Sequence, residues 1–131
     1  MKQKWVIDVI KEKIFYCNTE LALDVIGGKW KPLILYHLDF NETIRFGEFK
    51  RLIPNVSESV LSRQLKELER DRLIIRDEYM ENVPRVEYSL SQEGKRLSPI
   101  IVQLGEWGKS YNMNYQYGQL HFNNNYEDEK C

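Results

Sequence analysis

The 131-residue sequence has few of the residues that build catalytic, metal and disulfide sites. It contains only two cysteines and two histidines. Cys17 and Cys131 are far apart and lack metal-ligand spacing. No nucleophile or paired acid accompanies His37 or His121 at a useful distance in the sequence. We therefore expect neither enzymatic activity nor a metal or other cofactor.

Membrane-length apolar runs and a signal peptide pattern are also absent from the sequence. Charge of one sign is not in excess, because 19 Lys and Arg face 20 Asp and Glu, for a net charge of -1. Within residues 28–96 the balance is thirteen cationic against twelve anionic side chains. We therefore expect a cytoplasmic protein with no membrane contact, in which any nucleic-acid surface would depend on clustering of cations rather than on total charge.

The most informative segment begins at Ser57, which is expected to cap a helix that ends near Asp71. Leu61, Leu65 and Leu68 recur at helical spacing and predict a buried face. The opposite face carries cations and hydroxyls, which phosphates and base edges accept. The candidate DNA-binding residues there are Ser57, Glu58, Ser59, Ser62, Arg63, Lys66 and Arg70.

Within this face we expect Arg63 to contact guanine, while Lys66 and Arg70 bind phosphate. The alternative is an ordinary solvated face with ion pairs such as Arg63 with Glu67.

Two predicted strands follow, at Leu73–Tyr79 and Arg85–Leu90, because polar and apolar residues alternate there. Arg85 at the hairpin tip and Arg76 on the preceding strand are candidates for minor-groove or phosphate contacts. A helix pair followed by a hairpin is typical of a winged helix-turn-helix. The predicted fold class is therefore mainly α with a small β-hairpin (α+β).

The other predicted elements frame this unit. They are a helix over about 4–15, a helix capped by Asn18 or Thr19 that ends at Gly27, a buried helix with Pro32 in its first turn, a loop over 39–43, an extended piece over 44–46, a helix over Phe46–Ile53, and a helix that starts at Ser91 and restarts after a slight kink at Pro99.

These residues resemble the HxlR-type regulators, winged-helix relatives of MarR proteins. The resemblance extends from about Cys17 to Trp107 and rests on the motifs Gly27-Gly28-Lys29-Trp30, Arg45-Phe46, Leu61-Ser62, Val86-Glu87-Tyr88 and Gly94. It implies a homodimeric bacterial transcriptional regulator. We expect such a dimer to bind double-stranded DNA at an inverted repeat.

The sequence departs from the family pattern at three positions. Arg72 replaces a glycine, which predicts either a less sharp turn or a cation near the backbone. Asn18 replaces a proline after the cysteine, and Arg85 replaces a second proline in the wing.

The implied dimer would use the amino-terminal helix and the helix from Pro99 to about Tyr117, since both carry apolar stripes that one small domain cannot cover. The expected interface residues are Trp5, Val6, Val9, Ile10, Ile14, Ile100, Ile101, Leu104, Trp107 and Tyr111. The expected division of the chain is 1–16 for the first dimerisation helix, 17–96 for the DNA-binding domain, 97–122 for the second dimerisation helix and 123–131 for a flexible tail.

Cys17 matches the position of a cysteine that senses oxidants or electrophiles in some proteins of the resembled family. Its place before a predicted helix start favours thiolate, although many such cysteines are simply small packing residues. The sequence leaves open whether the effector is a small molecule, an oxidant or neither. It also leaves a second function open, that of a protein-interaction module without DNA binding.

Overall fold

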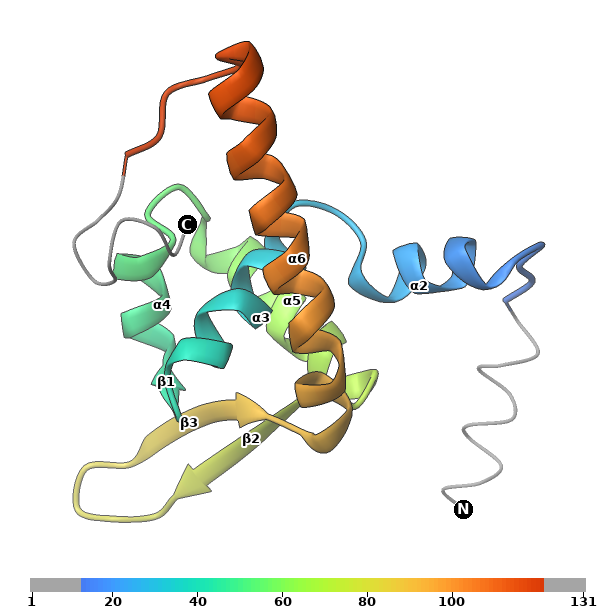
Figure 1. Cartoon of the computed structure of the whole chain (residues 1–131). Helices are drawn as coiled ribbons and strands as arrows, with labels where there is room; N and C mark the ends of the chain where they lie inside the picture. Colours follow the sequence, from blue (N-terminus) through green and yellow to red (C-terminus); the bar gives the residue numbers. More distant parts are fainter. Residues whose placement is uncertain (1–12, 122–131) are drawn as a thin grey trace.

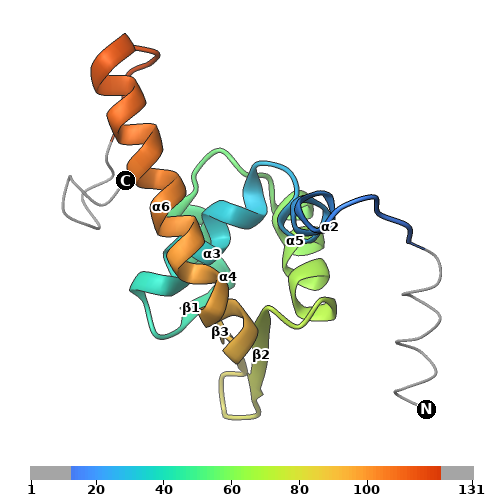
Figure 2. The same cartoon turned by 45° about the vertical axis from the view of Figure 1, so that its right-hand side comes forward.

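The computed structural model describes residues 13–121 and combines a helical body with a small antiparallel sheet (Figure 1). In chain order its elements are α2 (Asn18–Ile26), α3 (Trp30–Phe40), β1 (Ile44–Arg45), α4 (Phe46–Leu52), α5 (Glu58–Arg70), β2 (Ile74–Tyr79), β3 (Arg85–Leu90) and α6 (Gln92–Tyr115). The β2–β3 hairpin lies at one end of the body, and the C-terminal half of α6 rises from the other (Figures 1 and 2). The predicted winged helix-turn-helix is confirmed.

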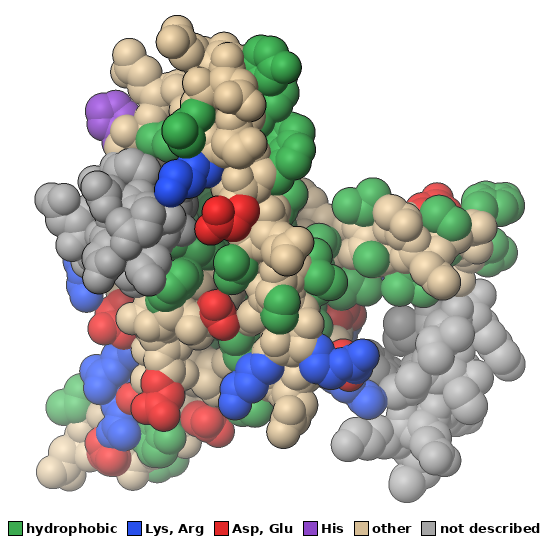
Figure 3. All heavy atoms as spheres, viewed as in Figure 1, with side chains coloured by type: hydrophobic (Ala, Val, Ile, Leu, Met, Phe, Trp, Pro, Cys, Tyr) green, Lys and Arg blue, Asp and Glu red, His purple; other side chains and the backbone are tan. Residues whose placement is uncertain are grey.

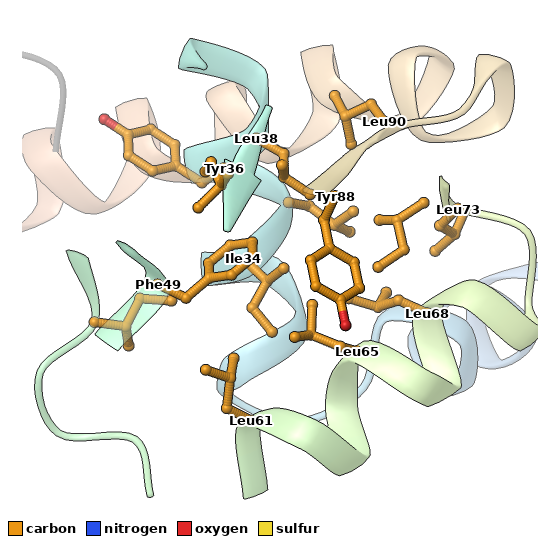
Figure 4. Packing of buried hydrophobic residues seen from close by; sticks show 14 of the residues in the cluster. Ile34, Tyr36, Leu38, Phe49, Leu61, Leu65, Leu68, Leu73, Tyr88 and Leu90 are labelled. Atoms are coloured by element: carbon orange, nitrogen blue, oxygen red, sulfur yellow. The ribbon is translucent and has the colours of Figure 1, made fainter. Parts of the chain in front are cut away.

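The core forms where α3, α4 and α5 meet the sheet. Ile34, Phe49 and Leu61 are completely buried, and their side chains converge in Figure 4. Leu65 and Leu68 are buried beside them, which confirms the predicted leucine stripe. A fully buried leucine contributes about 1.5–3 kcal/mol to stability. Leu61, Leu65 and Leu68 together therefore supply most of the packing energy that holds α5 on the core.

His37 belongs to this core and is only 6% exposed. Burial disfavours the charged imidazole and lowers the pKa of His37 to about 4. The ring is therefore neutral at pH 7, and it packs edge-on against Tyr36 with the ring centroids 5.2 Å apart. Its position inside α3 makes it a packing residue.

The sheet has the strand order β1-β3-β2, with both pairs antiparallel. Ile44 pairs with Tyr88, so the extended piece predicted over 44–46 forms a short third strand. Tyr79 pairs with Arg85 next to the turn at the tip of the hairpin. The alternation predicted for the last strand is confirmed, since Tyr88 and Leu90 are buried.

The turn from α5 into β2 places Arg72 in the left-handed region, with φ at 68°. The Leu73 N–H donates to the Leu68 carbonyl at 2.9 Å, and the Arg72 N–H donates to the Glu69 carbonyl at 3.0 Å. These two bonds define a Schellman motif, in which glycine is favoured at the position of Arg72. The expected loosening of the turn is therefore wrong, because arginine adopts the conformation that glycine would take.

The amino-terminal region differs from the prediction. Residues 13–15 are not helical, and Ile14 is 78% exposed, so its expected place on a helix is wrong. A short amphipathic segment gains most of its helical stability from packing, and the described residues give Ile14 no surface to pack on. Trp5, Val6, Val9 and Ile10 lie outside the described residues.

Helix α2 starts one or two residues earlier than expected, because either Asn18 or Thr19 was predicted as its cap. Cys17 is its N-cap, and the Sγ atom accepts the Glu20 N–H at 3.4 Å. Asn18 and Thr19, the expected caps, are inside the helix because the thiol takes the acceptor role that a serine hydroxyl usually has.

Helix α6 continues through Pro99 as one helix instead of restarting there. Pro99 is exposed, so its ring faces solvent and the helix loses a single backbone hydrogen bond. The helix ends at Tyr115 rather than near Tyr117, since Gln116 turns left-handed with φ at 50°. The α3 helix, in contrast, runs into the predicted loop over 39–43 and ends at Phe40.

Gly94 allows the first turn of α6 to touch the start of the hairpin. A Cβ atom at Gly94 would lie 2.2 Å from the Leu73 carbonyl oxygen. Ser91 stabilises the same junction. Its hydroxyl accepts the Gly94 N–H at 3.1 Å and donates to the Arg72 carbonyl at 2.6 Å. The Gly94 approach and the two Ser91 hydrogen bonds hold the start of the hairpin against the first turn of α6.

Replacing Gly94 by alanine should lower the free energy of unfolding by about 1–3 kcal/mol, because the helix must move away from Leu73. Urea denaturation followed by circular dichroism measures the change. Gly47→Ala is the matched control, since a Cβ there meets nothing within 4 Å. The control should be neutral or gain up to about 1 kcal/mol, and an equally stable Gly94→Ala would contradict the close contact.

Candidate nucleic-acid interface

The outward face of α5 brings together most of the DNA-binding residues expected from the sequence. Ser57 caps the helix, with its hydroxyl accepting the Val60 N–H at 3.2 Å. Beyond this cap, five candidate side chains are exposed and Ser62 is half-buried. The exposed five are Glu58, Ser59, Arg63, Lys66 and Arg70. The face therefore offers hydroxyls and cations while the leucines remain in the core.

A partly buried ion pair, which was not predicted from the sequence, determines which charges of this face stay unpaired. Lys31 on α3 is 6% exposed, and its Nζ lies 2.7 Å from the Glu67 Oε1 on α5. Glu67 is thereby directed to the interior instead of pairing with Arg63. Among the described residues, Arg63 and Lys66 make no ion pair, so the alternative of an Arg63–Glu67 surface bridge is not what the structure contains.

The hydrogen bond from Lys31 lowers the pKa of Glu67 below its ordinary value. A signal for this pair was present in the sequence, since Lys31 stands inside the apolar run that forms α3. Its partner could not be chosen from sequence because it is 36 positions away on another helix.

Arg70 lies at the C-terminal end of the same helix and differs from Arg63. Its Nε donates to the Asp71 Oδ1 at 3.2 Å, and this hydrogen bond raises the pKa of Arg70. Arg70 would therefore have to share its donors with Asp71 when it contacts a phosphate.

Both arginines expected to act in the wing are paired within the hairpin. The Arg76 Nη1 donates to the Glu78 Oε1 at 3.4 Å. Arg85 donates to Glu81 and, at 3.0 Å, to the Glu87 Oε2. These partners were not foreseen, although the spacing of Glu87 two residues after Arg85 on one strand face was visible in the sequence.

Cys17 is exposed and caps α2, which projects from the body as an arm (Figure 1). The arm is tied to the preceding segment by an ion pair of 2.9 Å between the Lys13 Nζ and the Asp24 Oδ2. Cys131, the other thiol, lies outside the described residues.

Apolar side chains are exposed on the α2 arm and on α6 (Figure 3). On α6 they include Ile100, Leu104 and Trp107, three of the expected interface residues. Tyr111, another of them, stacks on Trp107 with ring centroids 4.9 Å apart. Ile101 differs, because it is 5% exposed and belongs to the core of the subunit, so it is not available to a second copy.

A hollow of about 630 Å³ lies beside these aromatic rings, between α3, α6 and the segment over 117–120. Within the described part of the chain, no group of acidic, histidine or cysteine side chains could bind a metal ion. Over the same residues, none of the helices has the length and apolar character needed to cross a membrane.

Helices α4 and α5, the three-stranded sheet and the exposed face of α5 define a winged helix-turn-helix protein. Its structure is similar to that of a putative MarR-family regulator from Porphyromonas gingivalis W83, with a TM-score of 0.68 and 38% identity over 74% of this chain and 94% of that one. An HxlR-like helix-turn-helix family model matches residues 25–116. The chain therefore belongs to the HxlR family of helix-turn-helix transcriptional regulators.

Individual relatives agree with this assignment. The chain is 44% identical over 105 residues to the uncharacterised HTH-type transcriptional regulator YdeP of Bacillus subtilis (strain 168), covering 80% of this chain and 81% of YdeP. The structure is similar to that of the redox regulator HypR in its reduced form, with a TM-score of 0.71 and 42% identity over 77% of this chain and all of that one. The oxidised form of HypR gives a TM-score of 0.69 at 46% identity, over 72% of this chain and 96% of that one.

Replacing Glu67 by glutamine should lower the free energy of unfolding by about 2–4 kcal/mol at pH 7, because the buried Lys31 ammonium loses its anion. The pKa of Glu67 lies below its ordinary 4.5, so the pair stabilises the fold above pH 4.5, and the effect is lost as pH falls through the folded-state pKa. The difference between wild type and Glu67→Gln should therefore vanish in acid.

Urea denaturation at several pH values measures this difference. Glu69→Gln, on the same helix and without an ion pair among the described residues, is the matched control and should change stability by less than about 0.5 kcal/mol. If both variants lowered the free energy of unfolding by the same amount, the Lys31–Glu67 pair would not stabilise the fold more than an ordinary surface carboxylate does.

Proposed function

We propose that the protein is a homodimer that binds double-stranded DNA sequence-specifically at an inverted repeat and regulates transcription. The observation that carries this proposal is the exposed face of α5, where Arg63 and Lys66 are free of ion pairs among the described residues. A helix of this kind places its N-terminal residues in a major groove. The protein would act in the cytoplasm by binding, without catalysis.

Within the groove, Arg63 would read guanine through paired donors, while Ser59 and Ser62 would contact bases or phosphates. Lys66 and Arg70 would bind the backbone. Residues 17–96 would form the DNA-binding domain in this arrangement.

The dimer would form through the exposed apolar faces of α6 and the arm, with residues 1–16 and 97–122 as dimerisation segments. Leu104 is 56% and Trp107 is 61% exposed in the single chain, which supports burial against a second copy. The tail over 123–131 would take no part. Two α5 helices would then reach successive major grooves about 34 Å apart.

Arg63→Ala should reduce the preference for the selected operator over unrelated DNA by about 5- to 150-fold, since it removes a base contact worth about 1–3 kcal/mol. The operator is first selected from random duplexes, and affinities are then measured by fluorescence anisotropy. Nonspecific binding should persist. An unchanged preference would exclude Arg63 as the base reader.

Lys66→Ala is the comparison variant. It should weaken binding to every duplex alike and reduce the salt slope by about 1, as expected for one phosphate contact. A half-site duplex should bind more weakly than the inverted repeat if two subunits act together. Affinity that is weak and independent of salt for all duplexes would favour the alternative, a winged helix that binds only protein partners.

We further propose that oxidation of Cys17 regulates this binding. The exposed thiol at the start of α2 supports the proposal, as does the likeness to the redox regulator HypR. An exposed thiol is accessible to oxidants.

Treatment with diamide should change the operator affinity of the wild type by about fivefold or more, a usual size for coupling between two sites. The Cys17→Ser variant should keep its affinity under the same treatment. Cys131→Ser is the control that tests the second thiol. An equal change of operator affinity in wild type and Cys17→Ser would exclude Cys17 as the residue through which diamide acts.

A further inference from the structure

Arg85 is enclosed by its own hairpin, although it lies near the exposed tip. Its Nη1 donates to the Glu81 carboxylate and its Nε donates to the Glu87 Oε2 at 3.0 Å. The guanidinium carbon lies 4.1 Å from the centre of the Tyr79 ring. Only 26% of the Arg85 side chain is exposed as a result. The cation is therefore already paired and stacked before any duplex approaches.

The wing as a whole is acidic. Residues 74–90 contain two arginines and four carboxylates, for a net charge of -2 at neutral pH. This sum already includes Arg76, which is bonded to Glu78 on the same strand. Arg45 on β1 lies 3.9 Å from Glu87, its partner in the β1–β3 pairing, so Glu87 faces two arginines. Such a surface repels phosphates and cannot serve as a general anchor on DNA.

A guanidinium leaves two carboxylates only for a site of stronger negative potential. The narrow minor groove of an A·T tract is such a site, because groove narrowing concentrates the potential of the phosphates. Pairs that are partly exposed to solvent are weak, so the exchange is reversible. In the free protein the guanidinium also stacks on the Tyr79 ring, which adds a weak attraction to the two ion pairs.

We propose that Glu81 and Glu87 make Arg85 a conditional reader, which enters the minor groove beside the operator only where that groove is narrow. The inference rests on the proposed DNA binding and adds a specificity rule to it. In the free protein the carboxylates neutralise Arg85. On a wide groove they stay paired with it and the acidic wing repels the duplex, so operator flanks rich in A·T are selected.

The test uses two duplexes that share the selected core operator and differ only in the flanks under the wing, either an A-tract or G·C pairs. Wild type should prefer the A-tract flank by about five- to tenfold, the loss expected for one unfavourable base step. The Glu81→Gln/Glu87→Gln double variant should bind the G·C-flanked duplex about three- to tenfold more tightly, because the repulsion is removed. Its flank preference should fall below about twofold, since a free Arg85 accepts any phosphate.

Arg85→Ala should lose the flank preference by the opposite route, through weaker binding to the A-tract duplex. Glu93→Gln is the matched control, because Glu93 is also bonded to an arginine, at 2.6 Å from the Arg96 Nη1, but lies outside the wing. It should keep the wild-type preference. Glu81 is at the exposed tip, so Glu81→Gln alone shows a smaller shift in the same direction if the double variant disturbs the hairpin.

Two outcomes would overturn the inference while leaving the proposed function intact. The first is wild type that binds the operator with no flank preference, and the second is a Glu81→Gln/Glu87→Gln variant with wild-type affinities on both duplexes. If wild type bound no duplex at all, the proposed function itself would fail and the inference with it. The Arg63→Ala variant separates the proposed function from the inference. It should lose the preference for the core operator sequence and keep the preference for the A-tract flank.

Discussion

Three leucines determine what α5 presents to its surroundings. The helix is otherwise polar, and Leu61, Leu65 and Leu68 are the buried side chains that fix its rotation about its own axis. Because successive residues are about 100° apart on a helix, a slip by one residue would bury Ser62 or a charged neighbour and withdraw Arg63 from the exposed face. Such a slip would be costly, because α5 packs against α3 and β2.

The Lys31–Glu67 pair adds a second constraint that is electrostatic. α5 contains three cations and three carboxylates, so an unsorted face would be neutral and largely self-paired. Lys31 withdraws Glu67 into a partly buried contact, and Asp71 occupies Arg70 at the C-terminal end. The charges that remain free lie in the middle of the exposed face. The hairpin differs from α5, because both of its arginines are paired with carboxylates of the hairpin itself.

The sequence predicted those features that depend on local periodicity. The leucine stripe, the Ser57 cap and the alternating strand from Arg85 follow from spacing alone, and the structure confirms them. Features that depend on partners distant in the chain were missed, such as the pairing of β1 with β3 and the ion pair of Lys31. Ile101 shows the same limit. Some apolar residues of α6 pack into the subunit's own core and others are exposed, and the periodicity of the sequence does not show to which group Ile101 belongs.

The near-zero net charge bears on how DNA binding could work in such a molecule. One subunit offers few unpaired cations on α5 and an acidic wing, so a single copy would neutralise few phosphates and bind weakly. Joining two copies makes the second binding event intramolecular and multiplies affinity without adding a contact to either half. The exposed apolar side chains on α6 and α2 lie away from the hairpin (Figures 1 and 3), so they could join two copies without covering the wing. A weakly charged DNA-binding surface on α5 would then favour specificity. Nonspecific duplexes would gain little binding energy from it, and discrimination would depend on the few side chains that contact bases.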